Sequence, residues 1–349
     1  MNSPDLPPPT LRLQLDSDAL TANWRALDKL SGSARAGAAV KANAYGLGVD
    51  KVAPVLREAG AADFFVAHWS EVPEVLRHVS PGSVAVLHGP IRSEDARFAR
   101  ATGVRPVINS LHQARLWIDS GGGACDLMVD TGINRLGLPL EALAEPLVAQ
   151  LEVNALLSHL ASADEDVAQN ARQLAAFEEV SRHIPAKSRS LANSAGIALG
   201  NDYAFDLTRP GIALYGGIPR PELDGVIRQV VHPQAAVLQV RDLSAGDSVG
   251  YNATFTANEP MRVATVSLGY ADGFLRCWSG RGRLRFQGSD LPLLGRVSMD
   301  MVVVDCRTAP NICEGDWLDV PFSLPEASAI TGLSQYELLT TLGRRYLRE

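Results

Sequence analysis

The sequence predicts an α/β protein, with an N-terminal (β/α)8, TIM-like barrel at residues 1–228 and a mainly-β C-terminal domain at residues 229–349. Two patterns predict this division. In the first two thirds of the chain, short apolar runs recur about every 20 to 35 residues with helix-length segments between them, as in alternating parallel strands and helices. After residue 228, apolar and polar residues alternate between turns, which is typical of antiparallel strands.

Eight apolar runs are the expected barrel strands, because each is short and is bounded by turn residues. They lie at residues 36–40, 64–67, 84–87, 106–108, 127–129, 153–157, 190–192, and 204–207 continuing into 211–214. In the second domain, the runs 230–240 and 301–305 are expected strands, and 245–247 and 314–316 are expected turns. The spacing in the first domain also fits a flavodoxin-like open sheet, which is the structural alternative.

Lys41 directly follows the first expected strand and opens the loop 41–48. The carboxyl ends of barrel strands are where such enzymes place their chemistry. A lysine held against apolar walls has a lowered pKa, and its neutral amine can condense with an aldehyde. The alternative interpretation is a solvated lysine without a catalytic role.

Four further polar residues lie at or just after the carboxyl ends of other expected strands. They are Arg135, His159, Ser194 and Arg209. Because these strand ends meet at one mouth of a barrel, the residues are expected to converge with Lys41. Polar surface residues without a shared role would be scattered over both ends of the barrel.

The segment 40–48, Val-Lys-Ala-Asn-Ala-Tyr-Gly-Leu-Gly, closely resembles the pyridoxal-phosphate lysine segment of bacterial alanine racemases. Further segments resemble that family in the same order, at 130–137, 158–164, 192–195, 209–216, 249–254, 269–273 and 295–300. The resemblance covers nearly the whole chain. It implies a pyridoxal 5'-phosphate enzyme that interconverts L- and D-alanine, and a head-to-tail homodimer in which the β domain of one subunit completes the barrel mouth of the other.

By this resemblance, Ser194, Gly211 and Ile212 hold the cofactor phosphate, with the Tyr45 hydroxyl as a further ligand. Backbone N–H groups and hydroxyls at a helix start suit a phosphate. Ordinary strand-to-helix turn chemistry is the alternative for the serine and glycine.

The resemblance also assigns roles around the cofactor ring and the substrate. Arg209 faces the pyridine nitrogen, and because a guanidinium stays charged it keeps that nitrogen unprotonated. The alternative for Arg209 is an ion pair with Asp206. His159 contacts Arg209 or stacks near the ring, unless it is a hydrogen-bonded structural residue. Arg135 hydrogen-bonds the phenolic oxygen and approaches the substrate carboxylate, or it only caps the loop that begins at Asp130.

Racemisation needs proton exchange on both faces of Cα, so two acid/base groups are required. The resemblance implies Lys41 on one face and Tyr251, from the partner subunit, on the other. A basic tyrosine needs a lowered pKa and therefore nearby positive charge. The alternative for Tyr251 is an edge-strand aromatic.

Three more residues resemble the lining of the family's substrate passage: Tyr270, Met299 and Asp300. The Met299 backbone N–H is expected to bind the substrate carboxylate. Two positions depart from the family pattern. Met128 stands where many relatives have a lysine that orients the arginine corresponding to Arg135, so another anion or polar group is expected to do so here. Arg344 stands where many relatives have an aromatic residue.

Composition excludes several other classes of protein. The formal net charge of −7 argues against a nucleic-acid partner. No apolar stretch approaches the roughly 20 residues that span a bilayer, and the amino terminus lacks signal-peptide features, so a cytoplasmic location is expected. Four separated cysteines and the absence of metal-binding motifs predict no metal site. The functional alternatives are a broad-specificity racemase, a related decarboxylase and a non-catalytic pyridoxal-phosphate binding protein.

Overall fold

The computed structural model describes residues 7–349. Contacts divide the chain into two compact units, one of residues 17–228 and one that joins the residues up to 16 with residues 229–349. We call them the barrel unit and the β unit. At the amino terminus the structure differs from the expected division. There, Leu11–Leu15 (β1) pairs antiparallel with Val231–Leu243 (β12), so it belongs to the β unit.

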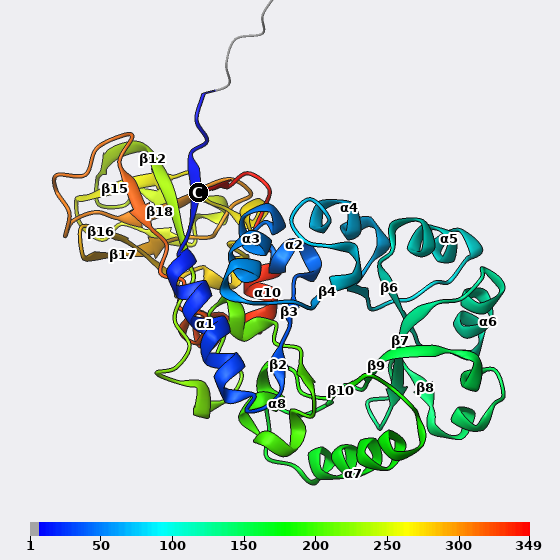
Figure 1. Cartoon of the computed structure of the whole chain (residues 1–349). Coiled ribbons are helices and arrows are strands. Elements are labelled where there is room, and N and C mark those ends of the chain that lie inside the picture. Colours follow the sequence, from blue (N-terminus) through cyan, green and yellow to red (C-terminus); the bar gives the residue numbers. More distant parts are fainter. Residues whose placement is uncertain (1–6) are drawn as a thin grey trace, which may run out of the picture. The chain divides into compact units, whose positions relative to one another are not determined.

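Parallel strands form a closed ring in the barrel unit (Figure 1). Seven of them pair in the order β10-β9-β7-β6-β5-β4-β3, and β2, which is separated from β3 by Gly37, pairs with β11. A bridge between Asn193 and Arg209 joins the β10 segment to the β11 segment and completes the ring. The expected barrel is therefore confirmed, and a flavodoxin-like open sheet is excluded. The strands are β2 (Arg35–Ala36), β3 (Ala38–Ala39), β4 (Phe64–Val66), β5 (Val84–Val86), β6 (Arg105–Ile108), β7 (Ala124–Asp130), β9 (Glu152–Leu157), β10 (Ser188–Ser190) and β11 (Leu207–Thr208), with β8 (Leu138–Pro139) beside β7.

The eighth strand is shorter than expected. Only Leu207–Thr208 pairs as a strand, and the apolar run 211–214 lies in a 3-10 helix, Ile212–Tyr215. The prediction that the strand continues into 211–214 was wrong. The physical reason is Pro210, which has no backbone N–H to donate to a ladder.

Helices lie outside the strand ring (Figure 1). The helix α1 (Ser17–Leu30) turns an apolar stripe inward, with Leu20, Trp24 and Leu27 among its buried residues. The longer helices are α1 (Ser17–Leu30), α3 (Val49–Ala59), α5 (Ser93–Thr102), α6 (Leu111–Asp119) and α7 (Ala168–His183), and the shorter ones are α2 (Lys41–Tyr45), α4 (Val72–Val75) and α8 (Ser194–Ala198). In the part of the chain that the structure describes, no helix is both long and apolar enough to cross a bilayer.

Buried ion pairs join the amino-terminal ends of the barrel strands. Arg105, at the start of β6, contacts Asp63 at 3.2 Å and Asp126 at 3.3 Å. Asp63 also accepts from the half-exposed Arg35 at 2.8 Å. These charges are paired and hydrogen-bonded, as buried charges must be, and they link four segments of the ring at this end.

The β unit is built around an antiparallel ring. Its order is β15-β18-β17-β16-β19-β12, and β12 pairs back to β15. Residues such as Met261, Val263 and Leu294 form an apolar cluster within it. The remaining elements of the unit are β13 (Ser248–Val249), β14 (Phe255–Thr256), β15 (Met261–Val266), β16 (Arg283–Phe286), β17 (Ser289–Leu294), β18 (Val302–Asp305), β19 (Trp317–Asp319), β20 (Leu347–Arg348), α9 (Leu324–Thr331) and α10 (Gln335–Thr340).

Candidate active site

Lys41 follows the first barrel strand, as the sequence predicted. Backbone hydrogen bonds hold this strand on both sides. The Val40 N–H donates to the backbone oxygen of Phe65 at 2.9 Å, and the Ala39 N–H donates to the backbone oxygen of Pro210 at 2.9 Å. Lys41 then opens α2, which is not a right-handed helix. Its next four residues have φ of 54° (Ala42), 54° (Asn43), 53° (Ala44) and 55° (Tyr45). None of them is glycine, and this left-handed conformation costs about 1–2 kcal/mol per residue, so surrounding contacts must hold it.

The pKa of the Lys41 amine is lowered from its ordinary value. Burial is the main cause, because it disfavours the ammonium form. The positive charge of Arg135 lowers it further, the carboxylate of Glu71 opposes the shift, and Arg209 adds a smaller lowering effect. These conditions favour a neutral, nucleophilic amine.

Tyr45, Ser194 and Gly211 come together at the end of the eighth strand. Ser194 Oγ accepts from the backbone N–H of Gly211 at 2.9 Å and of Ala213 at 3.2 Å. A Cβ added to Gly211 would lie 2.2 Å from the Tyr45 hydroxyl oxygen, so a larger residue there would require the Tyr45 side chain or the backbone to shift. Ile212 is buried and begins the 3-10 helix that follows. Hydroxyls and a helical start therefore lie together, which suits a phosphate.

Arg209 is buried, and its guanidinium lies among neutral oxygens. Nη1 donates to the backbone oxygen of Ser190 at 2.7 Å and to Ser190 Oγ at 2.5 Å, and Nη2 donates to the backbone oxygen of Ser158. Burial lowers its pKa to about 10, against the opposing charge of Asp126, so it is a cation at neutral pH. Asp206 pairs with Arg189, at 3.7 Å. The alternative of an ion pair between Arg209 and Asp206 was therefore wrong.

His159 lies among three basic side chains. Its pKa is lowered to about 3, first by burial and then by the charges of Arg209, Arg135 and Lys41. The imidazole is therefore neutral over the physiological range. The charges of Arg209, Arg135 and Lys41 act on His159, and these are residues that the sequence predicted to lie near it.

The loop that ends at Arg135 is organised by Asp130. The Asp130 carboxylate accepts the backbone N–H groups of four loop residues, from Gly132 to Arg135, at 2.8 to 3.2 Å. The Arg135 side chain is exposed and lowers the pKa of Lys41 and of His159 by its charge. Arg135 can therefore both belong to the loop that Asp130 caps and act on Lys41 through its charge. Met128 is buried on β7.

Sequence reasoning missed three polar residues near Lys41. The Glu71 carboxylate accepts the backbone N–H of Ala42, the residue after Lys41. The rings of His68 and His88 meet edge to face with their centroids 4.2 Å apart. His68 and His88 follow the expected strands 64–67 and 84–87, so the strand-end rule that selected Arg135 also applied to them.

The other expected site residues lie in the β unit. Tyr251 is 68% exposed and opens a 3-10 turn, Tyr251–Ala253. Met299 and Asp300 are the exposed central residues of a turn in which Met301 N–H donates to Ser298 Oγ at 3.1 Å. The Tyr270 N–H donates to the Ser298 backbone oxygen at 3.0 Å, so the two loops are in contact.

Sequence reasoning also missed Arg345, which binds Asp272 and Asp300 in these loops. The neighbouring Arg344, which departs from the family pattern, is exposed, and Tyr346 is buried.

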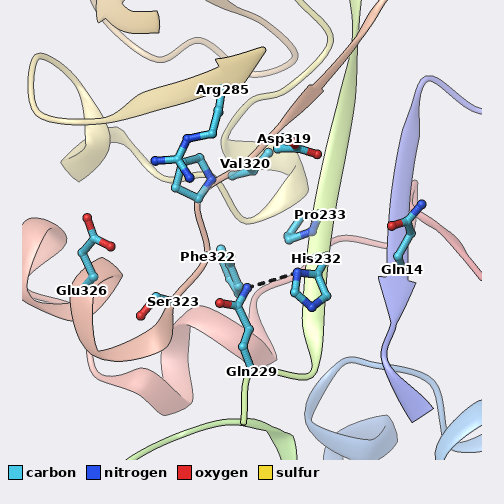
Figure 2. A pocket seen from close by; sticks show the side chains of 11 residues that line it. Gln14, Gln229, His232, Pro233, Arg285, Asp319, Val320, Phe322, Ser323 and Glu326 are labelled. Carbon is cyan, nitrogen blue, oxygen red and sulfur yellow. Dashed lines mark hydrogen bonds between the residues drawn. The ribbon is translucent and has the colours of Figure 1, made fainter. Parts of the chain in front are cut away.

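A separate pocket of about 350 Å³ lies within the β unit (Figure 2). Its lining includes His232, Arg285, Asp319 and Glu326, and Gln229 contacts the His232 ring at 3.5 Å. Charges of both signs line it, and it contains none of the expected site residues. The pocket is therefore separate from the candidate site at the strand ends of the barrel unit.

Comparison with known proteins agrees with this architecture. The family model for the alanine racemase N-terminal domain matches residues 15–219, and the model for the C-terminal domain matches residues 230–349. An alanine racemase of Methylobacterium nodulans is 42% identical over 97% of this chain and 95% of its own length. A catabolic alanine racemase of Agrobacterium fabrum is 38% identical over 96% of this chain and 91% of its own length.

A crystal structure of alanine racemase from Bartonella henselae with covalently bound pyridoxal phosphate has a TM-score of 0.89 and 37% identity. That match covers 97% of this chain and 99% of the other. Both domain models, the relatives and the shared fold agree over nearly the full length. The chain therefore belongs to the alanine racemase family.

Proposed function

We propose that this chain interconverts L-alanine and D-alanine with pyridoxal 5'-phosphate bound covalently to Lys41. The observation that supports this most directly is the strand-end amine of lowered pKa in the same barrel unit as the hydroxyl and glycine cradle of Tyr45, Ser194 and Gly211. When bound, the cofactor withdraws electrons from the amino-acid Cα and so acidifies its proton. The relative with bound pyridoxal phosphate supports the same assignment.

The barrel residues fit this cofactor. Ser194, Gly211, Ile212 and Tyr45 would hold the phosphate, because a Cβ at position 211 would fill the space that the Tyr45 hydroxyl approaches. Arg209 would face the pyridine nitrogen. Its guanidinium is fixed by three neutral oxygens and keeps its charge at neutral pH, so that nitrogen would stay unprotonated and side reactions of the carbanion would be suppressed.

His159 and Arg135 would complete the ring environment. A neutral His159 beside Arg209 adds no competing positive charge. Arg135 would bind the cofactor's phenolic oxygen and the substrate carboxylate, and the Asp130 carboxylate holds its backbone.

Once the substrate amine has displaced Lys41 from its bond to the cofactor, the freed Lys41 amine and Tyr251 would act as the two acid/base groups on opposite faces of Cα. One group accepts the Cα proton from its face while the other donates a proton to the opposite face, and the roles reverse for the other enantiomer. Tyr251 would come from the partner subunit of a homodimer, consistent with its exposure at the start of a turn. Met299, Tyr270 and Asp300 would line the substrate passage and favour a small side chain. The cytoplasm is the proposed location, and both D-alanine supply for peptidoglycan and D-alanine catabolism are consistent uses.

The test starts from the absorbance spectrum of the purified, cofactor-saturated protein. A visible band that borohydride reduction fixes at Lys41, with D-alanine appearing after addition of L-alanine, is the expected result. A band without D-alanine would refute the substrate assignment, and no band would refute the cofactor assignment.

Replacement of Tyr251 by phenylalanine tests the two-base assignment. Loss of a general base typically lowers the rate about a hundredfold to ten-thousandfold. We expect Tyr251→Phe to impair the two enantiomers unequally, because each direction uses the phenol differently. Small and equal losses would contradict the assignment.

A further inference from the structure

The turn that contains Lys41 is held in an unusual conformation before any ligand is considered. Its residues Ala42 to Tyr45 all have left-handed backbone angles although none is glycine. Local bonds support part of the turn: Ala44 N–H donates to Val40 at 2.8 Å, and Gly46 N–H donates to Ala42 at 2.9 Å. Such a conformation persists only where its surroundings over-determine it.

A side chain from another strand end supplies one of these constraints. Glu71 ends the 3-10 helix Trp69–Glu71, which follows β4. One carboxylate oxygen accepts the backbone N–H of Ala42. The other accepts the N–H groups of Ala67 at 2.8 Å and His68 at 2.9 Å. Three backbone donors therefore occupy both oxygens, and the carboxylate joins the end of β4 to the residue after Lys41.

The same carboxylate acts on the Lys41 amine. Its negative charge opposes the lowering of the Lys41 pKa by burial and by Arg135. Glu71 thus combines a fixed position with a fixed charge beside the reactive lysine.

We propose that Glu71 is a positioning residue that fixes the left-handed turn and thereby sets the direction of Lys41 before the cofactor binds. The inference rests on the proposed function, because it concerns the capture of pyridoxal 5'-phosphate by that lysine. Glu71 touches neither cofactor nor substrate in this role. It acts through the backbone of Ala42.

Glu71→Gln is the sharpest test, because a glutamine has nearly the same shape but only one acceptor oxygen. An amide NH2 would then oppose either the Ala42 N–H or the pair from Ala67 and His68. Glu74→Gln is the matched control. Glu74 lies three residues away on α4 and is exposed, and its carboxylate lies 3.9 Å from Arg77.

Two measurements on cofactor-free protein distinguish a role of Glu71 in positioning Lys41 from a general effect of Glu71 on the stability of the fold. Hydrogen exchange of the backbone amides of residues 41–46 reports the turn itself. The rate constant for capture of added pyridoxal 5'-phosphate, followed by visible absorbance and divided by the folded fraction, reports Lys41. We expect Glu71→Gln to exchange at least about tenfold faster there and to capture the cofactor at least about tenfold more slowly, since a hydrogen bond to a charged group is lost. Glu74→Gln is expected to match the wild type in both.

The outcomes distinguish this inference from the proposed function. If the wild-type protein forms no visible band, the proposed function fails, and faster exchange in Glu71→Gln then supports only the fixing of the turn. If the wild type forms the band and Glu71→Gln captures the cofactor at the control rate, the inference is overturned, even if its melting temperature falls. Should Glu71→Gln not fold, Glu71→Asp keeps the charge but is one methylene too short to bridge both segments. It must show the same two changes.

Discussion

Arg345 and Asp272 form a two-point ion pair in the β unit. Nε lies 2.7 Å from Oδ1 and Nη2 lies 2.9 Å from Oδ2. The Asp272 side chain is 1% exposed, whereas that of Arg345 is 48% exposed. Oδ2 also accepts the Gly269 N–H at 2.9 Å, so the pair anchors the loop that contains Tyr270. A third contact, 2.7 Å from Arg345 Nη1 to Asp300, reaches the turn that contains Met299.

Arg345→Ala is expected to destabilise the β unit by about 2–3 kcal/mol. Removing one partner of a fully buried ion pair costs about 3–5 kcal/mol, and the half-exposed guanidinium reduces this figure. Asp300→Asn breaks only the exposed contact and should cost about 0–1 kcal/mol. Urea unfolding of both variants measures the difference. Equal losses would mean that the bond to buried Asp272 is not the one that matters.

Gly211→Ala is expected to weaken cofactor binding more than it weakens the fold. The new Cβ would lie 2.2 Å from the Tyr45 hydroxyl oxygen, so the tyrosine or the 211–213 backbone must move. We expect the dissociation constant for pyridoxal 5'-phosphate to rise at least about tenfold, equivalent to about 1.4 kcal/mol. Absorbance titration of cofactor-free protein measures it.

Gly82→Ala is the control for that substitution, because nothing lies within 4 Å of an added Cβ there. It should bind the cofactor like the wild type. A Gly211→Ala protein that also binds normally would remove Gly211 from the proposed phosphate site.

Acid sensitivity is expected at His159. Its pKa in the folded protein is about 3, against an ordinary 6.5. Between these values the unfolded chain binds a proton that the folded protein does not bind, so stability falls as pH falls. The loss is at most about 1.4 kcal/mol per pH unit.

His159→Asn should remove this part of the pH dependence. Unfolding free energies of cofactor-free protein at pH 6.5 and 4.5 give the comparison. His183→Asn is the control, because His183 is exposed on α7 and pairs with Glu179 at 2.9 Å. Parallel pH profiles for the wild type and His159→Asn would show that burial does not hold this imidazole neutral.

Sequence patterns predicted the strand ends well because a buried parallel strand is a local signal. The runs 64–67 and 84–87 consist of consecutive apolar residues, and they end within one residue of β4 and β5. The eighth strand was overextended because Ile212 to Leu214 are as apolar as a strand. Pro210 was the signal that ends it.

Contacts between distant segments were not predictable in the same way. Nothing in the sequence Lys-Ala-Asn-Ala-Tyr indicates left-handed angles, since alanine favours right-handed helices. The conformation depends on bonds such as that from Ala42 to Glu71, 29 positions away. Arg345 likewise binds Asp272 across 73 positions, and its side chain has no local pattern that would reveal a partner.

The stability of the cofactor-free barrel unit is expected to rise with pH because of Lys41. Its folded pKa is lowered from 10.5, mainly by burial and by the charge of Arg135. Between the lowered value and 10.5, the unfolded chain binds a proton that the folded protein lacks, so raising the pH through that window stabilises the folded state by at most about 1.4 kcal/mol per pH unit. Lys41→Met, which keeps the apolar stem, should flatten this rise, whereas Lys51→Met, on an exposed position of α3, should retain it. Unfolding free energies at pH 7 and 9 measure both slopes. If Lys41→Met and the wild type gain equally, the amine is already neutral below this range or is not held out of water, and the electrostatic basis for its nucleophilicity fails.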